Sequence, residues 1–504
     1  MGIVKKQAFY NSIFNYIGQV IGYVNIALLF PILLSPEEFG LTRLITSYSV
    51  VFAQFSSIGI RRVIVRFFPF FRTIEDRGHH GFLILISAIP ALGFIVGALI
   101  FVLFKGQIIN SQADSGLFGK YAFLIPIAGF LTLCFWVLDS HLKALIRTSL
   151  SSFLSNVVLK LLWLISALMY YYKMLEFDSF MLMYFSSHAF LILVQIISLF
   201  RSGELNIQWD RQYLRFRVIK RVFYFGFFSI IDDATGVMTS HIDKIIIGSL
   251  LGLEPVAIYA LSSYISTVIN VPATSLNRVL SPLVSRYWRD KKRQEVESLY
   301  QKSTLLSFMA SGLFAVLIWG NVDSLLLLLP ETYRSGSLVI LVIMLAQLVE
   351  MGFGVNTEII SASKYYWYNS ISSFLLIVAL VVFNFLFIPI YGIVGAAMAT
   401  LFSKLIFNFG KFVFLYIKEG LQPFSIQNVK AVIILLVGYG IVELLPDIPI
   451  NNHMYMENVF NILYKSGIGF AFISTVIYLA NISTDVNAFA LQIARRGMKM
   501  IGRG

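Results

Sequence analysis

Charged residues are scarce in this sequence, and cysteine is almost absent. Asp, Glu, Lys and Arg together make up 13% of the 504 residues, whereas hydrophobic residues make up 58%. A soluble domain carries about 25% charged residues, so this chain has too few to cover a water-facing surface. We therefore predict an integral membrane protein. The single cysteine, Cys134, excludes an intramolecular disulfide and a cysteine-rich metal site.

The sequence also lacks the motifs of an enzyme. It contains no glycine-rich Walker loop, which excludes a built-in ATPase of that type. It has no cluster of His, Cys and carboxylate residues at the spacing of a metal site. The predicted outer loops are too short for a catalytic domain outside the membrane. We expect no catalytic residue, no metal and no cofactor, and we predict that the protein is not an enzyme.

Long apolar segments dominate the rest of the chain. A membrane-spanning helix needs about 20 apolar residues, and 14 segments approach or exceed this length. The first is too long for the hydrophobic region of a signal peptide, so we predict that it is retained. The predicted fold class is all-α, with spans at about 9–34, 39–60, 81–104, 120–141, 149–172, 179–200, 223–251, 256–285, 303–320, 336–361, 367–388, 391–416, 429–445 and 459–482.

The basic residues fall mainly on one side of these spans. Of the 39 Lys and Arg residues, 28 lie on the side of the N-terminus, and only Lys105, Lys120, Lys173 and Arg334 lie on the other side. Such an excess marks the cytoplasmic side, which places both termini in the cytoplasm. The net charge of +13 has the same origin, so we expect no nucleic-acid partner.

A weak internal repeat indicates two similar halves. A shift of 217 positions aligns "LLSPEEFGLTRLITSYS" with "LLGLEPVAIYALSSYIS", and Arg61 with Arg278. Each half holds an even number of helices, so the halves are expected to be related by a pseudo-two-fold axis along the membrane normal. We predict an N-terminal six-helix lobe, a basic interfacial linker, a C-terminal six-helix lobe, two further helices and a basic amphipathic tail, at residues 1–205, 206–222, 223–420, 421–484 and 485–504. The linker and the tail are expected to bind anionic lipids of the inner leaflet.

The span at 223–251 carries an unusual set of charges. Asp233 and Lys244 fall on one face of the predicted helix, His241 lies beside them, and Asp232 and Asp243 form an adjacent strip. Unpaired charges at this depth of a bilayer cost several kcal/mol each. Two interpretations are open: the face lines a water-filled cavity between the two lobes, or Asp243 and Lys244 pair with neighbouring helices and lock the bundle.

Two arginines are candidates for binding an anion in that cavity. Arg278 lies in the next span at a depth similar to that of Asp232 and Asp233, which predicts a salt bridge between them. Arg61 is its counterpart in the repeat. Two guanidinium groups that face the interface between the two lobes suit a diphosphate, because each can bind phosphate oxygens through two hydrogen bonds. The alternative is that Arg61 merely begins a cytoplasmic loop.

Further ionisable residues interrupt other predicted spans, and each is either a pathway residue or a structural one. The candidates for substrate binding are Arg61, Lys160, His241, Lys244, Arg278 and Lys404. The candidates for ion coupling or gating are Asp232, Asp233, Asp243, Glu350 and Glu358. A gradient of H+ or Na+ is the candidate energy source.

Two motifs resemble those of a known family. "SPEEFGL" at 35–41 fits the pattern P-E-E-F-G, and "HIDKIIIGSLLGLEPVAIYALSSYI" at 241–265 fits D-K-x-x-I-G-x-x-L-G. Together with the helix count, they make the chain similar to the polysaccharide transporters, which include the O-antigen and capsule oligosaccharide flippases of the MATE-like superfamily. Asp243, Lys244 and Gly248 match the second pattern residue by residue, whereas Val256 stands where a glycine is common.

The resemblance implies a flippase that moves a polyprenyl-diphosphate-linked oligosaccharide to the outer leaflet by alternating access. The implied location is the bacterial inner membrane. Polysaccharide polymerase and ligase proteins are the candidate partners, and the expected state is a monomer. Three alternatives remain: a MATE-like exporter of organic cations, a lipid II flippase and a membrane scaffold without transport activity.

Overall fold

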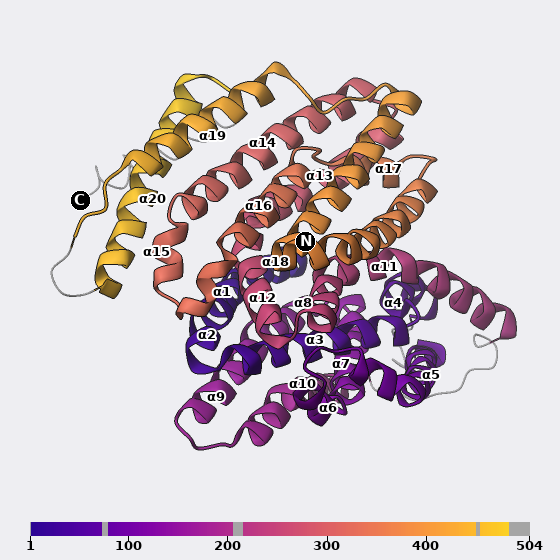
Figure 1. Ribbon diagram of the computed structural model, residues 1–504. Helices are drawn as coiled ribbons and strands as arrows, with labels where there is room; N and C mark the ends of the chain where they lie inside the picture. The colour runs from indigo at the N-terminus through magenta and orange to yellow at the C-terminus, as the bar shows by residue number, and fades with distance from the viewer. Residues whose placement is uncertain (1, 73–78, 205–214, 450–453, 483–504) are drawn as a thin grey trace, which may run out of the picture. The chain divides into compact units, whose positions relative to one another are not determined.

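The computed structural model describes residues 2–72, 79–204, 215–449 and 454–482, and every regular element in these ranges is a helix (Figure 1). The predicted all-α membrane fold is therefore confirmed. The helices form two compact units, unit 1 with Met1–Ile265 and Ser373–Ala399, and unit 2 with Ser266–Ser372 and Thr400–Gly504. The predicted lobes are contiguous in sequence, and their boundaries stay a prediction. Most of the predicted linker and the whole predicted tail lie outside the described residues.

Unit 1 holds the first twelve α-helices and the middle of a later one. Its elements are α1 (Gly2–Tyr23), the π-helix η1 (Val24–Leu29), α2 (Phe30–Leu33), α3 (Pro36–Ser56), α4 (Ile60–Phe71), η2 (His79–Gly81), α5 (Phe82–Asn110), α6 (Ser115–Tyr121), α7 (Leu124–Ala144), α8 (Thr148–Phe153), the π-helix η3 (Leu154–Val158), α9 (Leu159–Tyr171), α10 (Phe177–Arg201), α11 (Phe216–Leu250), all but the end of α12 (Leu253–Thr267), and residues 373–399 of α18 (Trp367–Glu419).

Unit 2 holds the remaining helices. They are η4 (Val268–Asn270), α13 (Val271–Arg289), α14 (Arg293–Trp319), α15 (Val322–Leu327), η5 (Glu331–Gly336), α16 (Ser337–Met351), α17 (Asn356–Ala362), both ends of α18, α19 (Ile426–Leu444) and α20 (Met454–Leu479).

Fewer spans than the predicted 14 are identified in the described part of the chain. In the described part of the chain, 11 helices or runs of helices are long and apolar enough to cross a membrane. One of them, α18, covers two predicted spans and contains a break at Gly392, whose φ of 59° and ψ of −138° are not helical. Helices α3 and α11 are also long enough, but they are not among the 11 because they are too polar.

These two polar helices pack against each other. Each buries part of its polar surface on the other, so neither needs to present that surface to lipid. Their contact is close at Gly248 of α11, which has no side chain, and Gly40 of α3 allows an equally close approach to the first residue of α12. A Cβ at Gly40 would lie 1.9 Å from the Leu253 carbonyl oxygen, and a Cβ at Gly248 would lie 2.9 Å from the Leu44 side chain.

The motif "SPEEFG" is the start of α3. The Ser35 hydroxyl accepts a hydrogen bond from the Glu38 amide at 3.2 Å, and the Glu38 carboxylate accepts one from the Ser35 amide at 2.9 Å. This capping box, with Pro36 in the first turn, fixes where the helix begins. The motif therefore sets the register of every residue that α3 presents to α11.

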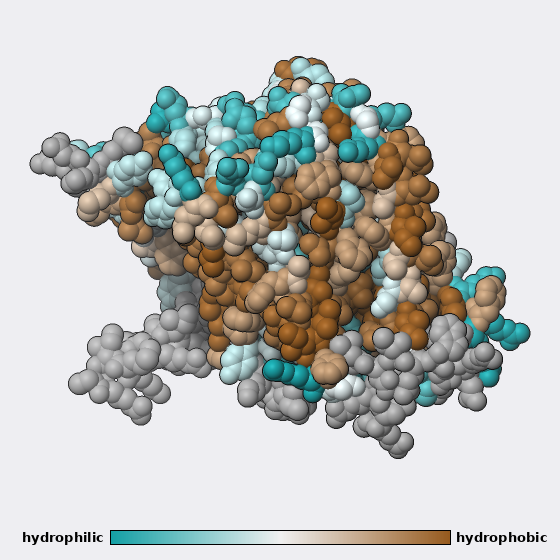
Figure 2. Space-filling model, turned by 90° about the horizontal axis from the view of Figure 1, so that it is seen from below, coloured by the Kyte–Doolittle hydropathy of each residue, from teal (hydrophilic) through white to brown (hydrophobic). Residues whose placement is uncertain are grey.

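The outer surface of the helices is apolar where lipid would surround it. Helix α5 exposes a long row of large hydrophobic side chains, among them Leu92, Ile95, Leu99, Val102 and Leu103. Figure 2 shows a broad hydrophobic field on one face of the molecule, with hydrophilic side chains gathered along one border. Such a surface is typical of a multi-pass membrane protein.

Candidate functional site

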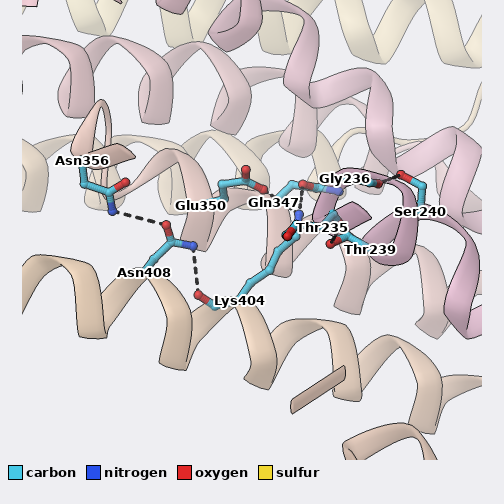
Figure 3. Close-up of polar contacts among 9 residues, drawn as sticks. All are labelled: Thr235, Gly236, Thr239, Ser240, Gln347, Glu350, Asn356, Lys404 and Asn408. Carbon is cyan, nitrogen blue, oxygen red and sulfur yellow. Dashed lines mark hydrogen bonds and ion pairs between the residues drawn. The ribbon is translucent and has the colours of Figure 1, made fainter. Parts of the chain in front are cut away.

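Two hydroxyl groups of α11 are satisfied within the helix. Thr239 donates to the carbonyl of Thr235 at 2.8 Å, and Ser240 donates to the carbonyl of Gly236 at 2.9 Å (Figure 3). The Lys244 ammonium donates to the carbonyl of Ser240 in the same way. The polar face predicted for this helix therefore includes a lysine whose charge is held by a main-chain carbonyl.

Asp243 forms a different type of contact. Its carboxylate is buried and accepts hydrogen bonds from the Tyr259 hydroxyl of α12 and from the side-chain amide of Asn384 in α18, the latter at 2.8 Å. Two neighbouring helices are thus tied to α11 through one carboxylate. Of the two interpretations of the charges in this span, the lock describes the contacts of Asp243.

A buried arginine that the sequence analysis did not select lies in α3. Arg43 is 8% exposed, and its Nη2 donates to the hydroxyl of Tyr184 at 2.6 Å. The rings of Phe30 and Phe39 lie 5.6 and 5.2 Å from the guanidinium carbon, which is within the range of cation–π attraction. Among the described side chains no carboxylate pairs with Arg43, and its Nε has no hydrogen-bond partner.

Arg43 has two of the predicted site residues as neighbours. The positive charge of Arg43 lies close enough to His241 and Lys244 of α11 to interact electrostatically with both. It interacts in the same way with Tyr264 of α12. The His241 Nδ1 lies 3.1 Å from the hydroxyl of Ser47, one turn along α3. The packing of α3 on α11 therefore brings three nitrogen-bearing side chains together in the interior of unit 1.

Lys160 of α9 completes this group. Its ammonium donates to the Gly18 carbonyl of α1 at 2.6 Å. Both Lys160 Nζ and the Tyr264 hydroxyl lie within 2.7 Å of the position that a Cβ would take at Gly22, so Tyr264 links Lys160 to Arg43. The π-helices η1 and η3 lie in the two spans that meet here, and π-helical turns are frequent at functional sites.

We call Arg43, Lys160 and Lys244, with the adjacent His241 and Tyr264, the cationic cluster. A phenol hydroxyl and two main-chain carbonyls hold its three positive charges. No ion pair with a carboxylate is found for any of the three within the described residues. Arg43 is buried, and Lys160 and Lys244 are half-buried. Charges withdrawn from water are normally paired, so the cluster has the electrostatics of a site for an anion.

Other basic residues line a cavity of about 660 Å³ in unit 1, which we call the arginine cavity. Helices α4, α7 and α11 supply most of its walls, and the lining contains four basic and two acidic side chains. The lining residues are Arg61, Arg62, Val65, Arg66, Phe135, Trp136, Asp139, Ser140, Lys143, Ser155 and Asp233.

Aromatic rings position two of these arginines. The Arg61 guanidinium lies 4.3 Å from the centre of the Trp136 ring, and that of Arg66 lies 4.4 Å from the centre of the Phe225 ring. Arg61 Nη2 also donates to the side chain of Gln54 at 2.7 Å. Arg61 is therefore part of an ordered wall of the cavity and does more than begin a loop.

Asp233 has a different partner from the one we predicted. Its carboxylate lies 2.7 Å from Arg62 Nε and 3.9 Å from Arg61 Nη2, because α4 packs directly against α11. The carboxylate expected to pair with Arg278 is thus already paired with arginines of α4. Arg278 is exposed on α13, and the side chain of Asp232 lies outside the described residues.

Unit 2 brings together two further predicted residues. The Lys404 ammonium of α18 lies 2.6 Å from both the Glu350 carboxylate and the Gln347 side-chain oxygen of α16 (Figure 3). Glu358 lies half-buried on α17. Lys404 and Glu350 were predicted as separate candidates, and in the structure they form an ion pair.

Two family models match the chain. The model "Polysaccharide biosynthesis protein" matches residues 4–288, which is more than half of the sequence, and the model "MatE" matches residues 229–390. A curated relative, "Capsular polysaccharide biosynthesis protein CapF" from Staphylococcus aureus, is 25% identical over 176 residues, which are 34% of this chain and 44% of CapF. The match thus spans less than half the length of that relative.

Solved structures share the fold. "Lipid II flippase MurJ, inward closed conformation" is 13% identical, with a TM-score of 0.69 over 94% of this chain and 99% of that chain. An inward-facing multidrug resistance MATE family transporter of the MOP superfamily is also 13% identical, with a TM-score of 0.61 over 81% of this chain and 94% of that chain. At these identities the similarity shows the fold alone.

The helical membrane fold and the family matches agree with the expectation from the two motifs. The protein is a multi-pass membrane transporter and not an enzyme. The chain belongs to the polysaccharide biosynthesis protein family of MATE-like transporters.

Proposed function

We propose that this transporter is a flippase that moves an oligosaccharide linked to a polyprenyl diphosphate from the cytoplasmic to the outer leaflet. The observation that carries the proposal is the cationic cluster, in which Arg43, Lys160 and Lys244 are held by neutral oxygens. Cations that are partly or fully withdrawn from water and have no carboxylate partner favour an anionic ligand. A diphosphate supplies several oxygens that can accept hydrogen bonds from Arg and Lys.

The arginine cavity supports an entry route for the same headgroup. Its lining has two more basic than acidic side chains, and Trp136 offers an aromatic face beside Arg61. By the predicted orientation this cavity lies toward the cytoplasmic side, where the lipid-linked sugar would be collected. Basic groups at that side raise the local concentration of an anionic headgroup.

The same charges argue against export of organic cations. A site for a cation needs carboxylates that are free to face it, but Asp233 is paired with Arg62 and Asp243 is bonded to Tyr259 and Asn384. The two predicted carboxylates of α11 that are described are therefore already committed within unit 1. An anionic cargo needs no rearrangement of these pairs.

Three further elements belong to this proposal. The protein would work in the bacterial inner membrane with both termini in the cytoplasm, and it would hand its cargo to a polymerase and a ligase. A gradient of H+ or Na+ would energise the cycle. The cationic cluster and the net positive lining of the arginine cavity support the choice of an anionic cargo.

The proposal is tested with the purified protein in liposomes that contain a fluorescent polyprenyl-diphosphate oligosaccharide. A membrane-impermeant reductant quenches the fraction in the outer leaflet, so its access reports flipping. We expect activity in the native protein and a large loss in Arg43→Gln and Lys244→Gln, whereas Lys120→Gln, which alters an exposed lysine of the short helix α6, serves as the matched control. Equal activity in all four proteins would reject the cluster as the binding site.

Two other cargoes serve as comparison arms in the same assay. If lipid II is flipped as fast as the oligosaccharide lipid, the protein is a lipid II flippase or has broad specificity. If the liposomes instead expel a cationic dye and leave the diphosphate lipid in place, the proposed function is wrong.

A further inference from the structure

Lys404 in unit 2 is a buried cation whose counter-ion is half exposed. The Lys404 side chain is 8% exposed, whereas the side chain of its partner Glu350 is 45% exposed. The ammonium also donates to the Gln347 side chain at 2.6 Å. The lysine is thus fixed in the protein, whereas the side chain of its counter-ion is half exposed.

A network of amides holds the lysine end of this pair in place. Asn408 donates to the Lys404 carbonyl at 2.9 Å, and Asn356 donates to the Asn408 side chain at 3.4 Å (Figure 3). Asn356 begins α17, and between it and the end of α16 the chain passes through Gly354, whose φ is +53°. Glu350 therefore lies in the last turn of α16, next to a break in the helix, while Lys404 lies within a continuous part of α18.

Because Glu350 is half exposed and lies at a helix end, whereas Lys404 is buried within a helix, Glu350 is the member of the pair that another anion can replace. Removing Glu350 from Lys404 would leave a buried charge without a counter-ion, which is strongly unfavourable. If another anion takes its place, the lysine keeps an ionic partner and the released carboxylate, already half exposed, can be solvated. A discontinuous membrane helix beside a charged pair is also a common setting for ligand sites in transporters.

We propose that Lys404 is a second binding point for the diphosphate of the transported lipid and that Glu350 is the internal anion displaced by it. This inference rests on the proposed function, because it concerns the same cargo. Gln347 would remain as a neutral hydrogen-bond partner of Lys404 throughout the exchange. The pair thus acts as a specificity device, since only a group that satisfies Lys404 at least as well as a carboxylate can displace Glu350.

Two other charged groups, Lys411 and Glu358, lie near this pair. The positive charge of Lys411 interacts electrostatically with the carboxylates of Glu350 and Glu358, and the two carboxylates interact with each other. Lys411 is 1% exposed, donates to the Thr357 hydroxyl at 2.9 Å, and lies 3.9 Å from the centre of the Phe407 ring. Lys411 is therefore part of the electrostatic surroundings of the pair. Lys465 of α20 is the matched control for Lys404, because its side chain is only 12% exposed and lies 2.7 Å from an exposed carboxylate, that of Asp447.

The test measures binding of farnesyl diphosphate to the full-length protein in lipid nanodiscs. Glu350→Gln keeps an oxygen that can accept a hydrogen bond from Lys404 but removes the competing charge, so the affinity should rise at least about fivefold, the lower end of usual coupling between sites. Lys404→Met should lower the affinity by a similar factor. In the double variant Glu350→Gln/Lys404→Met the gain should disappear, whereas Lys465→Met, which removes a lysine paired with Asp447, should bind as the native protein does.

The double variant also controls for folding, because it leaves neither member of the pair charged. Unchanged affinity in Glu350→Gln, or a gain that persists without Lys404, would overturn the inference. If Arg43→Gln loses binding but the Lys404 and Glu350 variants do not, only this inference fails. If the native protein binds no farnesyl diphosphate, the inference and the proposed function fail together.

Discussion

The guanidinium of Arg43 donates a hydrogen bond to the hydroxyl of Tyr184 at a distance of 2.6 Å. A residue of α3 and a residue of α10 thus meet through a charge and a neutral phenol in the interior of unit 1. The contact holds the arginine in position without neutralising it, which leaves the positive charge available to a ligand.

Replacement of Tyr184 separates positioning from charge. We expect Tyr184→Phe to lower the free energy of unfolding by about 1.5–3 kcal/mol, the usual worth of a hydrogen bond to a charged group, and to weaken cargo binding less than Arg43→Gln does. Thermal unfolding in detergent and the liposome assay measure the two effects. Tyr172→Phe, at a 70% exposed position, is the control. A larger transport defect in Tyr184→Phe than in Arg43→Gln would contradict this division of roles.

The carboxylate of Asp243 is predicted to be structural. Asp243→Asn should lower the free energy of unfolding by about 1.5–3 kcal/mol, because the hydrogen bonds from Tyr259 and Asn384 lose their charged acceptor. The affinity for the diphosphate probe should stay the same. Tyr259→Phe should show the same pattern with a smaller loss of stability. A stable Asp243→Asn protein that no longer transports would instead make this residue part of the ion-coupling machinery.

The pair formed by Arg62 and Asp233 should contribute little to stability. Arg62 has 45% of its side chain exposed, and exposed ion pairs are worth about 0.2–1 kcal/mol. A double-mutant cycle with Arg62→Gln and Asp233→Asn measures the coupling energy directly, and added salt should reduce it. A coupling energy well above this range would show that the pair is shielded from solvent.

The close contact of α3 with the start of α12 should not tolerate a side chain at Gly40. Gly40→Ala places a methyl group against the Leu253 carbonyl, and overpacking of this type costs about 1–3 kcal/mol. Gly106→Ala is the matched control, since nothing lies within 4 Å of a Cβ at that position. Thermal unfolding compares the two variants. Equal midpoints would mean that the helices can separate at no cost.

Sequence patterns were sufficient for the helices and for one side of the site. Apolar length gave the spans, and the charges of 223–251 marked α11. Neither apolar length nor charge indicated the importance of α3, because Arg43 was only one of several basic residues within the predicted spans. What distinguishes it is the contact with Tyr184, 141 positions away, and no local pattern reveals a contact of that range.

The partners of charged residues were the least predictable feature. Depth in the membrane placed Asp233 level with Arg278, but many side chains share a depth, and the packing of α4 on α11 decides which of them is in reach. By contrast, the motif around Asp243 was found from sequence, and its tyrosine and aspartate turn out to bond to each other. A motif that stabilises a fold is as recognisable in sequence as one that binds a ligand.

Gly40 of α3 has a mechanical consequence. The main-chain carbonyl of Leu253, at the start of α12, faces this residue without a side chain, so no side chains interlock at that point. Two helices in such a contact can move apart and return without a change of side-chain rotamers there, which suits a protein whose helices move in every transport cycle.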